Sequence, residues 1–166
     1  NQGMLKPDDK VTGVDYDEEL SVVVVRTERA TDYEQKMKKR VQTSGCAQGT
    51  VFGDLMEALE NVSLPSTEFR TSWLYTLTQT INTTPSLYLE AGAIHGCVLA
   101  KEDRALVYME DVGRHNALDK LVGGMVRQGI RPEGAGVLTS RVSTDMVQKV
   151  AMLGAPGPAL ADESDN

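Results

Sequence analysis

This sequence contains few of the residues that most directly reveal a protein's chemistry or its compartment. Its 166 residues include two cysteines and two histidines, and no apolar run approaches the roughly 20 residues that span a bilayer. Two cysteines can close one disulfide but not a framework of them, so we expect a reducing cytoplasm in which both thiols stay available for chemistry. Residues 1–9 also lack the basic-then-apolar layout of a signal peptide. The sequence therefore predicts a cytoplasmic protein without a membrane segment.

Positive charge is also scarce. There are 17 lysines and arginines against 24 acidic residues, which gives a net charge of −7 and argues against a nucleic-acid surface. Apolar residues make up 40% of the chain and charged residues 25%, as is usual for a globular protein. The length suits one compact domain with a core of its own.

The first part of the chain contains a predicted strand and a predicted loop. Residues 21–26 are a β-branched run, which predicts a buried strand. Residues 43–53 are typical of a loop because glycines are spaced around Cys46, and we expect a short helix from there to residue 61.

A second predicted helix follows. Residues 63–66 are suited to cap its start, and residues 82–85 to end it. Phe69, Trp73 and Leu77 recur at four-residue spacing, so we expect this stripe to lie in the core.

The second half of the chain alternates strands with helices. Residues 97–100 and 105–109 are apolar runs separated by charged residues, which predicts a hairpin. Residues 136–139 predict another strand. The helix after it has one apolar face and ends at Gly154; that face consists of Val142, Met146, Val150 and Leu153. This order of elements predicts an α/β protein with a layered sheet.

The most informative stretch is residues 110–123, Glu-Asp-Val-Gly-Arg-His-Asn-Ala-Leu-Asp-Lys-Leu-Val-Gly. It places two acids, an Arg-His-Asn cluster and an Asp-Lys pair in a turn that opens an amphipathic helix, which Gly129 and Pro132 end. The predicted apolar face of that helix contains Ala117, Leu118, Leu121, Val122, Met125 and Val126. The polar cluster therefore lies at the positive end of a helix dipole, which suits an anion such as a phosphate.

A purely structural interpretation of this cluster explains part of it. Asn116 can cap the helix, and Asp119 can form a salt bridge with Lys120. This interpretation leaves unexplained why two acids, an arginine and a histidine share one turn.

The functional interpretation assigns those residues to an anion site. Arg114 can hold a phosphate through two hydrogen bonds, and His115 can exchange protons near neutral pH. Ser140 and Arg141 begin the next predicted helix and can meet the same anion from a second direction.

The two cysteines differ in their surroundings. Cys46 lies in a glycine-flanked loop, which suits a mobile nucleophilic thiolate, although a buried structural role remains the alternative. Cys97 follows His95 by two residues, a pair that can begin a zinc site. The chain lacks both the His/Cys-x-Glu and the Pro-Cys-x-x-Cys elements of zinc deaminases, so we expect no metal and predict Cys97 to be a core residue of a strand.

Residues 110–123 resemble the signature of the FdhD family, the accessory sulfurtransferases of formate dehydrogenase. Two further segments match the same family in the expected order: residues 43–46, Thr-Ser-Gly-Cys, and residues 140–149, Ser-Arg-Val-Ser-Thr-Asp-Met-Val-Gln-Lys. The resemblance implies an α/β fold with three layers, in which helices flank a mixed sheet like that of cytidine deaminases. It implies a core domain over residues 1–154, without the family's outer N-terminal and C-terminal segments. We expect residues 155–166 to be a disordered tail.

The resemblance also implies a function. Cys46 would carry a persulfide received from a cysteine desulfurase and pass the sulfur to the molybdenum cofactor, in its bis-molybdopterin guanine dinucleotide form, for formate dehydrogenase. The resemblance further implies a homodimer. The residues expected to bind the cofactor are His95, Arg114, His115, Asn116, Asp119, Lys120, Ser140 and Arg141.

This sequence departs from the family at one chemically important position. Many members carry a second cysteine three residues after the first, where this chain has Gly49, so a sulfur relay here would use a single cysteine. The departure keeps open a rival interpretation, a chaperone that binds the cofactor without sulfur chemistry. A zinc deaminase is a third interpretation, and it predicts a bound metal.

Overall fold

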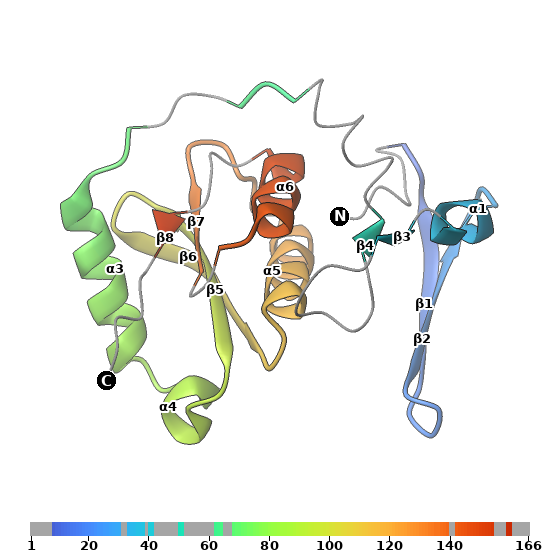
Figure 1. Cartoon of the computed structure of the whole chain (residues 1–166), viewed down its shortest axis with the longest axis horizontal. Helices are drawn as coiled ribbons and strands as arrows, with labels where there is room; N and C mark the ends of the chain where they lie inside the picture. The colour runs from blue at the N-terminus through green and yellow to red at the C-terminus, as the bar shows by residue number, and fades with distance from the viewer. Residues whose placement is uncertain are drawn as a thin grey trace. The chain divides into compact units, whose positions relative to one another are not determined.

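The computed structural model describes residues 8–30, 33–38, 40–41, 50–51, 62–64, 68–139, 142–154 and 159–160. The chain divides into two compact units, residues 1–60 and 61–166. Both contain helices and strands (Figure 1), so the predicted α/β class is confirmed.

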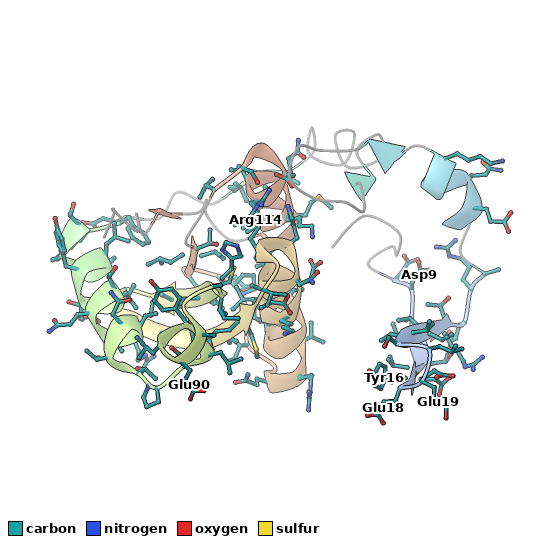
Figure 2. The ribbon with its side chains drawn as sticks, turned by 60° about the horizontal axis from the view of Figure 1, so that its bottom comes forward. Asp9, Tyr16, Glu18, Glu19, Glu90 and Arg114 are labelled. Atoms are coloured by element: carbon teal, nitrogen blue, oxygen red, sulfur yellow. The ribbon has the colours of Figure 1, made fainter. Side chains whose placement is uncertain are left out.

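The first unit is built around a β-hairpin. Strands β1 (Val11–Asp17) and β2 (Val22–Thr27) are antiparallel, and Glu18 and Glu19 lie in the turn at its tip (Figure 2). Within that turn the Asp17 carboxylate accepts a hydrogen bond from the backbone N–H of Leu20 at 2.9 Å. Helix α1 (Tyr33–Lys38) follows. Strands β3 (Arg40–Val41) and β4 (Thr50–Val51) then form a short antiparallel pair.

Strand β2 confirms the strand predicted over residues 21–26, but the prediction that it is buried is wrong. Its four consecutive valines are between 43 and 57% exposed. Val23 and Val25 share one face of the ribbon with their partners Tyr16 and Val14, and that face is exposed as well. β-Branched side chains favour an extended backbone whether or not another layer covers them, so the pattern indicated the conformation and not the burial.

The second unit contains a four-stranded sheet in the order β6-β5-β7-β8. Strand β5 (His95–Lys101) is antiparallel to β6 (Arg104–Asp111) and to β7 (Gly136–Thr139). Strand β8 (Ala159–Leu160) is parallel to β7. Because β6 and β7 both oppose β5, they run in the same direction and end at the same edge of the sheet.

Helices pack on both faces of this sheet. Cys97 and Leu99 of β5 face α5 (Arg114–Gln128) and α6 (Thr144–Leu153), whereas Val98 and Ala100 face α3 (Thr71–Thr83), as Figure 1 shows for the helices. The larger core cluster combines the sheet with both C-terminal helices; its buried residues are Cys97, Leu99, Val107, Ala117, Leu118, Leu121, Met125, Ala135, Val137, Met146 and Val150. The smaller cluster contains Leu77, Val98, Ala100 and Leu138. Both faces of β5 are therefore dry, as expected of a central strand.

Several predicted boundaries in this unit are confirmed, but the start of α6 is not. That helix begins at Thr144, so the prediction that Ser140 and Arg141 begin it and that Val142 lies on its apolar face is wrong. The hairpin turns at Glu102, which has a positive φ of 56°. Helices α5 and α6 end at Gly129 and Gly154, whose left-handed φ values of 65° and 79° suit glycine.

The start of α3 differs from the prediction. The helix begins at Thr71 and not directly after residues 63–66, and Arg70 is the extended N-cap residue. Phe69 therefore precedes the helix, where its ring meets Trp73 edge to face at 6.2 Å and lies against Gly136. Of the stripe predicted to lie in the core, Leu77 is buried, Trp73 is half-buried and Phe69 is 38% exposed. Helix α4 (Leu87–Ala91) was not predicted; the Ser86 hydroxyl caps it by accepting a hydrogen bond from the Leu89 N–H.

Several predicted features lie outside the described residues. These are most of the loop around Cys46, the helix expected to reach residue 61, and the pair Ser140 and Arg141. Of the predicted loop the structure describes Thr50 and Val51, which form a strand and not a loop. Within the predicted tail, the structure describes Ala159 and Leu160 alone. None of the helices that the structure describes has the length and apolar character needed to span a bilayer.

Candidate functional site

The signature residues collect at one edge of the second unit's sheet. Strand β6 ends there at Asp111 and β7 ends at Thr139, while β5 begins there at His95. His95 is the strand partner of Asp111, and Cys97 is the partner of Thr139. Helices α5 and α6 begin shortly after β6 and β7. In α/β proteins this arrangement, with strand ends and helix starts side by side, commonly forms the ligand site.

Glu110 has a structural role at this edge. Its carboxylate accepts hydrogen bonds from the backbone N–H groups of Leu87 and Tyr88 at 2.9 and 3.1 Å and from the Tyr108 hydroxyl at 2.7 Å. Burial opposes ionisation of Glu110, but these three donors outweigh it and hold its pKa below the usual value. Glu110 therefore ties the start of α4 to the end of β6.

Asp111 organises the first turn of α5. It accepts hydrogen bonds from the Gly113 N–H at 2.9 Å and from the Asn116 side-chain amide at 3.2 Å, and it pairs with the Lys120 ammonium at 2.6 Å. Burial opposes its ionisation, yet Lys120 and the other donors keep the Asp111 pKa low. The N-cap residue is Gly113, so the interpretation of Asn116 as the cap is wrong.

The predicted salt bridge between Asp119 and Lys120 is also wrong. Lys120 reaches back to Asp111 and to the Glu110 carbonyl, whereas Asp119 holds the Lys149 ammonium with both oxygens at 3.0 Å. Lys149 is 2% exposed. Lys149 was not predicted as a partner of Asp119, because the neighbouring Lys120 already offered that carboxylate an opposite charge. A helical signal was present, since Asp145 and Lys149 on α6 match the four-residue spacing of His115 and Asp119 on α5.

His115 faces α6 in a buried position. Its Nε2 lies 2.8 Å from an Asp145 carboxylate oxygen, and the two side chains are 12 and 6% exposed. The other Asp145 oxygen accepts a hydrogen bond from the Ser143 hydroxyl. Burial lowers the pKa of His115, and the nearby cations Lys149 and Arg114 add to this effect, against the opposing influence of Asp145 and Asp119. His115 is therefore mainly neutral near neutral pH.

Arg114 is the one cation of this cluster whose side chain forms no hydrogen bond or ion pair with the residues that the structure describes. It belongs to the first turn of α5, where Figure 2 labels it, and its charge acts on both His115 and Asp145. The N-cap residues Gly113 and Ser143 offer no side-chain hydrogen bond to the first turns of α5 and α6. A guanidinium beside two such helix starts can bind an anion.

The structure thus gathers part of the predicted site. Five predicted residues lie in the first two turns of α5: Arg114, His115, Asn116, Asp119 and Lys120. His95 is half-buried and lies at the start of β5, at the same edge of the sheet. Ser140 and Arg141 fall between Thr139 and Val142 in the sequence, and with Cys46 they lie outside the described residues. Whether these three face the same ligand stays a prediction.

Cys97 is a core residue of β5, as predicted. Its side chain is 0% exposed, and the thiol donates to the Thr139 hydroxyl at 3.4 Å. Burial raises the pKa of Cys97 to about 11, so the group is a thiol and not a thiolate near neutral pH. Across the described parts of the chain, no group of three or more His, Cys, Asp or Glu side chains is placed to hold a metal ion.

Comparison with known proteins gives consistent matches. A sulfur carrier protein FdhD of Bordetella parapertussis is 35% identical over 158 residues, which cover 88% of this chain and 55% of the relative. A sulfur carrier protein FdhD of Shouchella clausii is 28% identical over 160 residues, which cover 93% of this chain and 60% of the relative. The chain therefore spans little more than half the length of these curated relatives.

A solved structure and a family model extend the comparison. The crystal structure of a protein described as a formate dehydrogenase accessory protein, from Desulfotalea psychrophila, matches with a TM-score of 0.57 at 27% identity. The match covers 78% of this chain and 58% of that chain. The model of the FdhD/NarQ family matches residues 1–159, which include the first structural unit, most of the second and the signature helix. The resemblance seen in the motifs is confirmed, and the chain belongs to the FdhD/NarQ family.

Proposed function

We propose that this chain is the core of a sulfur carrier, a sulfurtransferase that passes persulfide sulfur from a cysteine desulfurase to the molybdenum cofactor for formate dehydrogenase. The observation that carries the proposal is the difference between its two cysteines. Cys97 is buried in the sheet with a raised pKa, so it cannot take up sulfur without unfolding. Cys46 is the remaining thiol, and the names of the relatives support sulfur carriage.

The loading step is a thiol exchange. The Cys46 thiolate attacks the outer sulfur of the donor's persulfide, a new S–S bond forms, and the donor's S–S bond breaks. The donor leaves as a thiolate, and Cys46 becomes the persulfide. The outer sulfur keeps its oxidation state as it moves from the donor cysteine to Cys46, so no outside oxidant or reductant takes part.

The cofactor is the acceptor, and we propose that the helix starts of the second unit bind it. Bis-molybdopterin guanine dinucleotide carries two pyrophosphates, which suit the Arg114 guanidinium and the uncapped first turns of α5 and α6. We place His95, Asn116, Asp119 and Lys120 around that position, together with Ser140 and Arg141. Arg114 would bind the charge of the pyrophosphate, and the neutral His115 would bind an uncharged part of the ligand.

The wider setting is also part of the proposal. We infer a three-layer fold of the cytidine deaminase type for the second unit, which the packing of helices on both faces of the sheet supports. We propose that the protein works in the cytoplasm as a homodimer, with a cysteine desulfurase and formate dehydrogenase as its partners.

Intact-mass measurement tests the sulfur relay. The chain is incubated with a cysteine desulfurase and cysteine, and its mass is compared with that of two matched variants, Cys46→Ala and Cys97→Ala. We expect a one-sulfur gain, removable by reductant, in the wild type and in Cys97→Ala but not in Cys46→Ala. A gain that persists in Cys46→Ala, or no gain beside an active desulfurase, would overturn the relay.

A cofactor-binding chaperone is the second candidate. Gly49 in place of a second cysteine favours it. So does the anion site, because its described residues include no reactive thiol. Under this alternative Cys46→Ala supports formate dehydrogenase activation as well as the wild type does. Arg114→Ala would lose nucleotide binding under both candidates, so the Cys46 variant decides between them.

A further inference from the structure

Helices α5 and α6 are joined by two polar pairs that cross between them. His115 meets Asp145, and one helical turn later Asp119 meets Lys149. Asp145 and Lys149 are among the few buried charged side chains of the described residues, and neither lies in the signature stretch. Burial of this kind needs a reason, because a buried charge without adequate partners is destabilising.

The distance between His115 and Asp145 fixes where the ring proton is. Burial opposes ionisation of Asp145, but the Ser143 hydroxyl and His115 hold its pKa below the usual value, so it is a carboxylate. Its oxygen lies 2.8 Å from Nε2 of His115. A lone pair on Nε2 would face that negative oxygen at contact distance and repel it. Nε2 therefore carries a proton whether the ring is neutral or charged.

The second ring nitrogen, Nδ1, then defines what chemistry the His115 ring can offer. The groups around the ring are Arg114 and Asp119 of its own helix and Asp145 and Lys149 of α6. Burial and the two cations favour the neutral ring, so Nδ1 carries a lone pair. Nδ1 is buried and has no hydrogen-bond partner among the described residues, and Nε2 and the Asp145 oxygen are not aligned as a hydrogen bond either. A buried acceptor without a donor is destabilising, so such an atom calls for a functional explanation.

We propose that Asp145 is a positioning residue, which fixes His115 with Nε2 as the donor and Nδ1 as the acceptor for a hydroxyl or amine hydrogen of the ligand. The ligand class that fits is an anion with a neighbouring hydrogen-bond donor. Arg114 takes the charge and the adjacent His115 takes the donor, as in a nucleotide with its diphosphate and its ribose hydroxyls. This inference rests on the proposed function for the choice of ligand, but not for the state of the ring.

Nitrogen NMR of the full chain tests the state of the ring directly. The chain has two histidines, so the His115 signals are assigned by their loss in His115→Gln. Near neutral pH we expect a neutral ring with a protonated Nε2 and an unprotonated Nδ1. A charged ring, or a proton on Nδ1, would overturn the inference regardless of any ligand.

Ligand addition tests the second half. Guanosine diphosphate should shift the Nδ1 signal toward that of a hydrogen-bonded acceptor, whereas pyrophosphate, which lacks the sugar hydroxyls, should bind without this shift. If both bind and Nδ1 responds to neither, the assigned acceptor role is wrong. If guanosine diphosphate does not bind at all, both the proposed cofactor site and the acceptor role of Nδ1 toward a ligand are wrong. The protonation state of the His115 ring is still tested separately by the spectrum of the free chain.

Asp145→Asn tests the positioning role with little change in shape. The new amide can donate to Nε2, which moves the ring proton to Nδ1 and removes the acceptor. We expect about a tenfold loss of affinity for guanosine diphosphate, the worth of one hydrogen bond, and little change for pyrophosphate. Asp103→Asn, in the exposed turn of the β5–β6 hairpin, is the matched control and should change neither. Unchanged ring signals and unchanged affinity in Asp145→Asn would overturn the proposal.

Discussion

The side chain of Lys149 is buried more completely than that of its partner, and this asymmetry has an energetic consequence. The lysine side chain is 2% exposed, whereas that of Asp119 is 39% exposed. Water can therefore hydrate the carboxylate when the lysine is removed, but it cannot reach the ammonium when the carboxylate is removed.

We predict that Asp119→Ala destabilises the chain more than Lys149→Met does. The alanine variant leaves a buried unpaired ammonium and should cost about 3–5 kcal/mol. The methionine variant fills a similar volume with an apolar chain and should cost about 1–2 kcal/mol. Urea unfolding of both variants measures the difference, and the reverse order would show that Lys149 is hydrated in the folded chain.

His115 should make stability depend on pH. Its folded-state pKa lies below the ordinary value because of burial, so the unfolded chain binds the proton more readily. The stability that this group contributes is present above about pH 6.5 and is lost as the pH falls below that value. The carboxylates Glu110, Asp111 and Asp145, whose pKa values are also low, lose their contributions at more acidic pH.

We therefore predict that His115→Asn flattens the pH dependence of the unfolding free energy just below about pH 6.5, the ordinary histidine pKa. The comparison uses slopes, so a uniform loss of stability in the variant does not affect it. Denaturant titrations at a series of pH values measure both slopes. Equal slopes for the variant and the wild type would contradict the assigned burial effect.

Among the elements, the short helix α4 depends on a residue far from it in sequence. Glu110 accepts hydrogen bonds from the backbone N–H groups of Leu87 and Tyr88, which have no hydrogen-bond partner within the helix because they lie in its first turn. We predict that Glu110→Gln costs about 1–2 kcal/mol and speeds amide exchange at these two positions. The exposed Glu90→Gln on α4 is the control (Figure 2). Unchanged exchange in Glu110→Gln would mean that Ser86 alone suffices as the cap.

The elements that the sequence predicted well are those whose signals are local. Helix α5 has its apolar face at helical spacing and a glycine at its end, and both signals depend on residues near the helix itself. Val126 is the exception, because it was predicted on the buried face and is 77% exposed. The start of α3 was misplaced because Phe69 fits the helical stripe equally well as a residue before the helix that packs against Trp73 and Gly136. Helix α4 depends on Glu110 for its start, a contact that no local pattern contains.

The candidate site was predictable in composition but not in its pairing. The signature stretch identified Arg114 and His115, yet the partners of His115 and Asp119 are on α6, thirty positions further along. Asp145 and Lys149 were overlooked because they lie beside the apolar positions Met146 and Val150, on a face expected to be apolar. Only packing of the two helices shows that this face includes a polar strip.

At the scale of the whole second unit, Cys97 reports on global unfolding. It lies at the centre of the sheet, between core layers on both faces, so local fraying of a helix end does not expose it. In the Cys46→Ala variant we predict that a thiol reagent modifies Cys97 about 10³-fold or more slowly than in denaturant. Urea below the transition should speed the reaction in parallel with the unfolded fraction. Rapid modification in native buffer would show that the sheet opens locally.

The two cross-helix pairs also limit how α5 and α6 can move. If α6 slid by one turn in one direction, Asp145 would come opposite Asp119, and two carboxylates would meet. A one-turn slip in the other direction would set Lys149 opposite His115. The Lys149 ammonium would then face the protonated Nε2, so two hydrogen-bond donors would meet without an acceptor. One-turn slips between these helices are therefore disfavoured in both directions, so we expect the spacing of their first turns to change little. Adjustment to a ligand falls to side-chain rotation, most of all at Arg114.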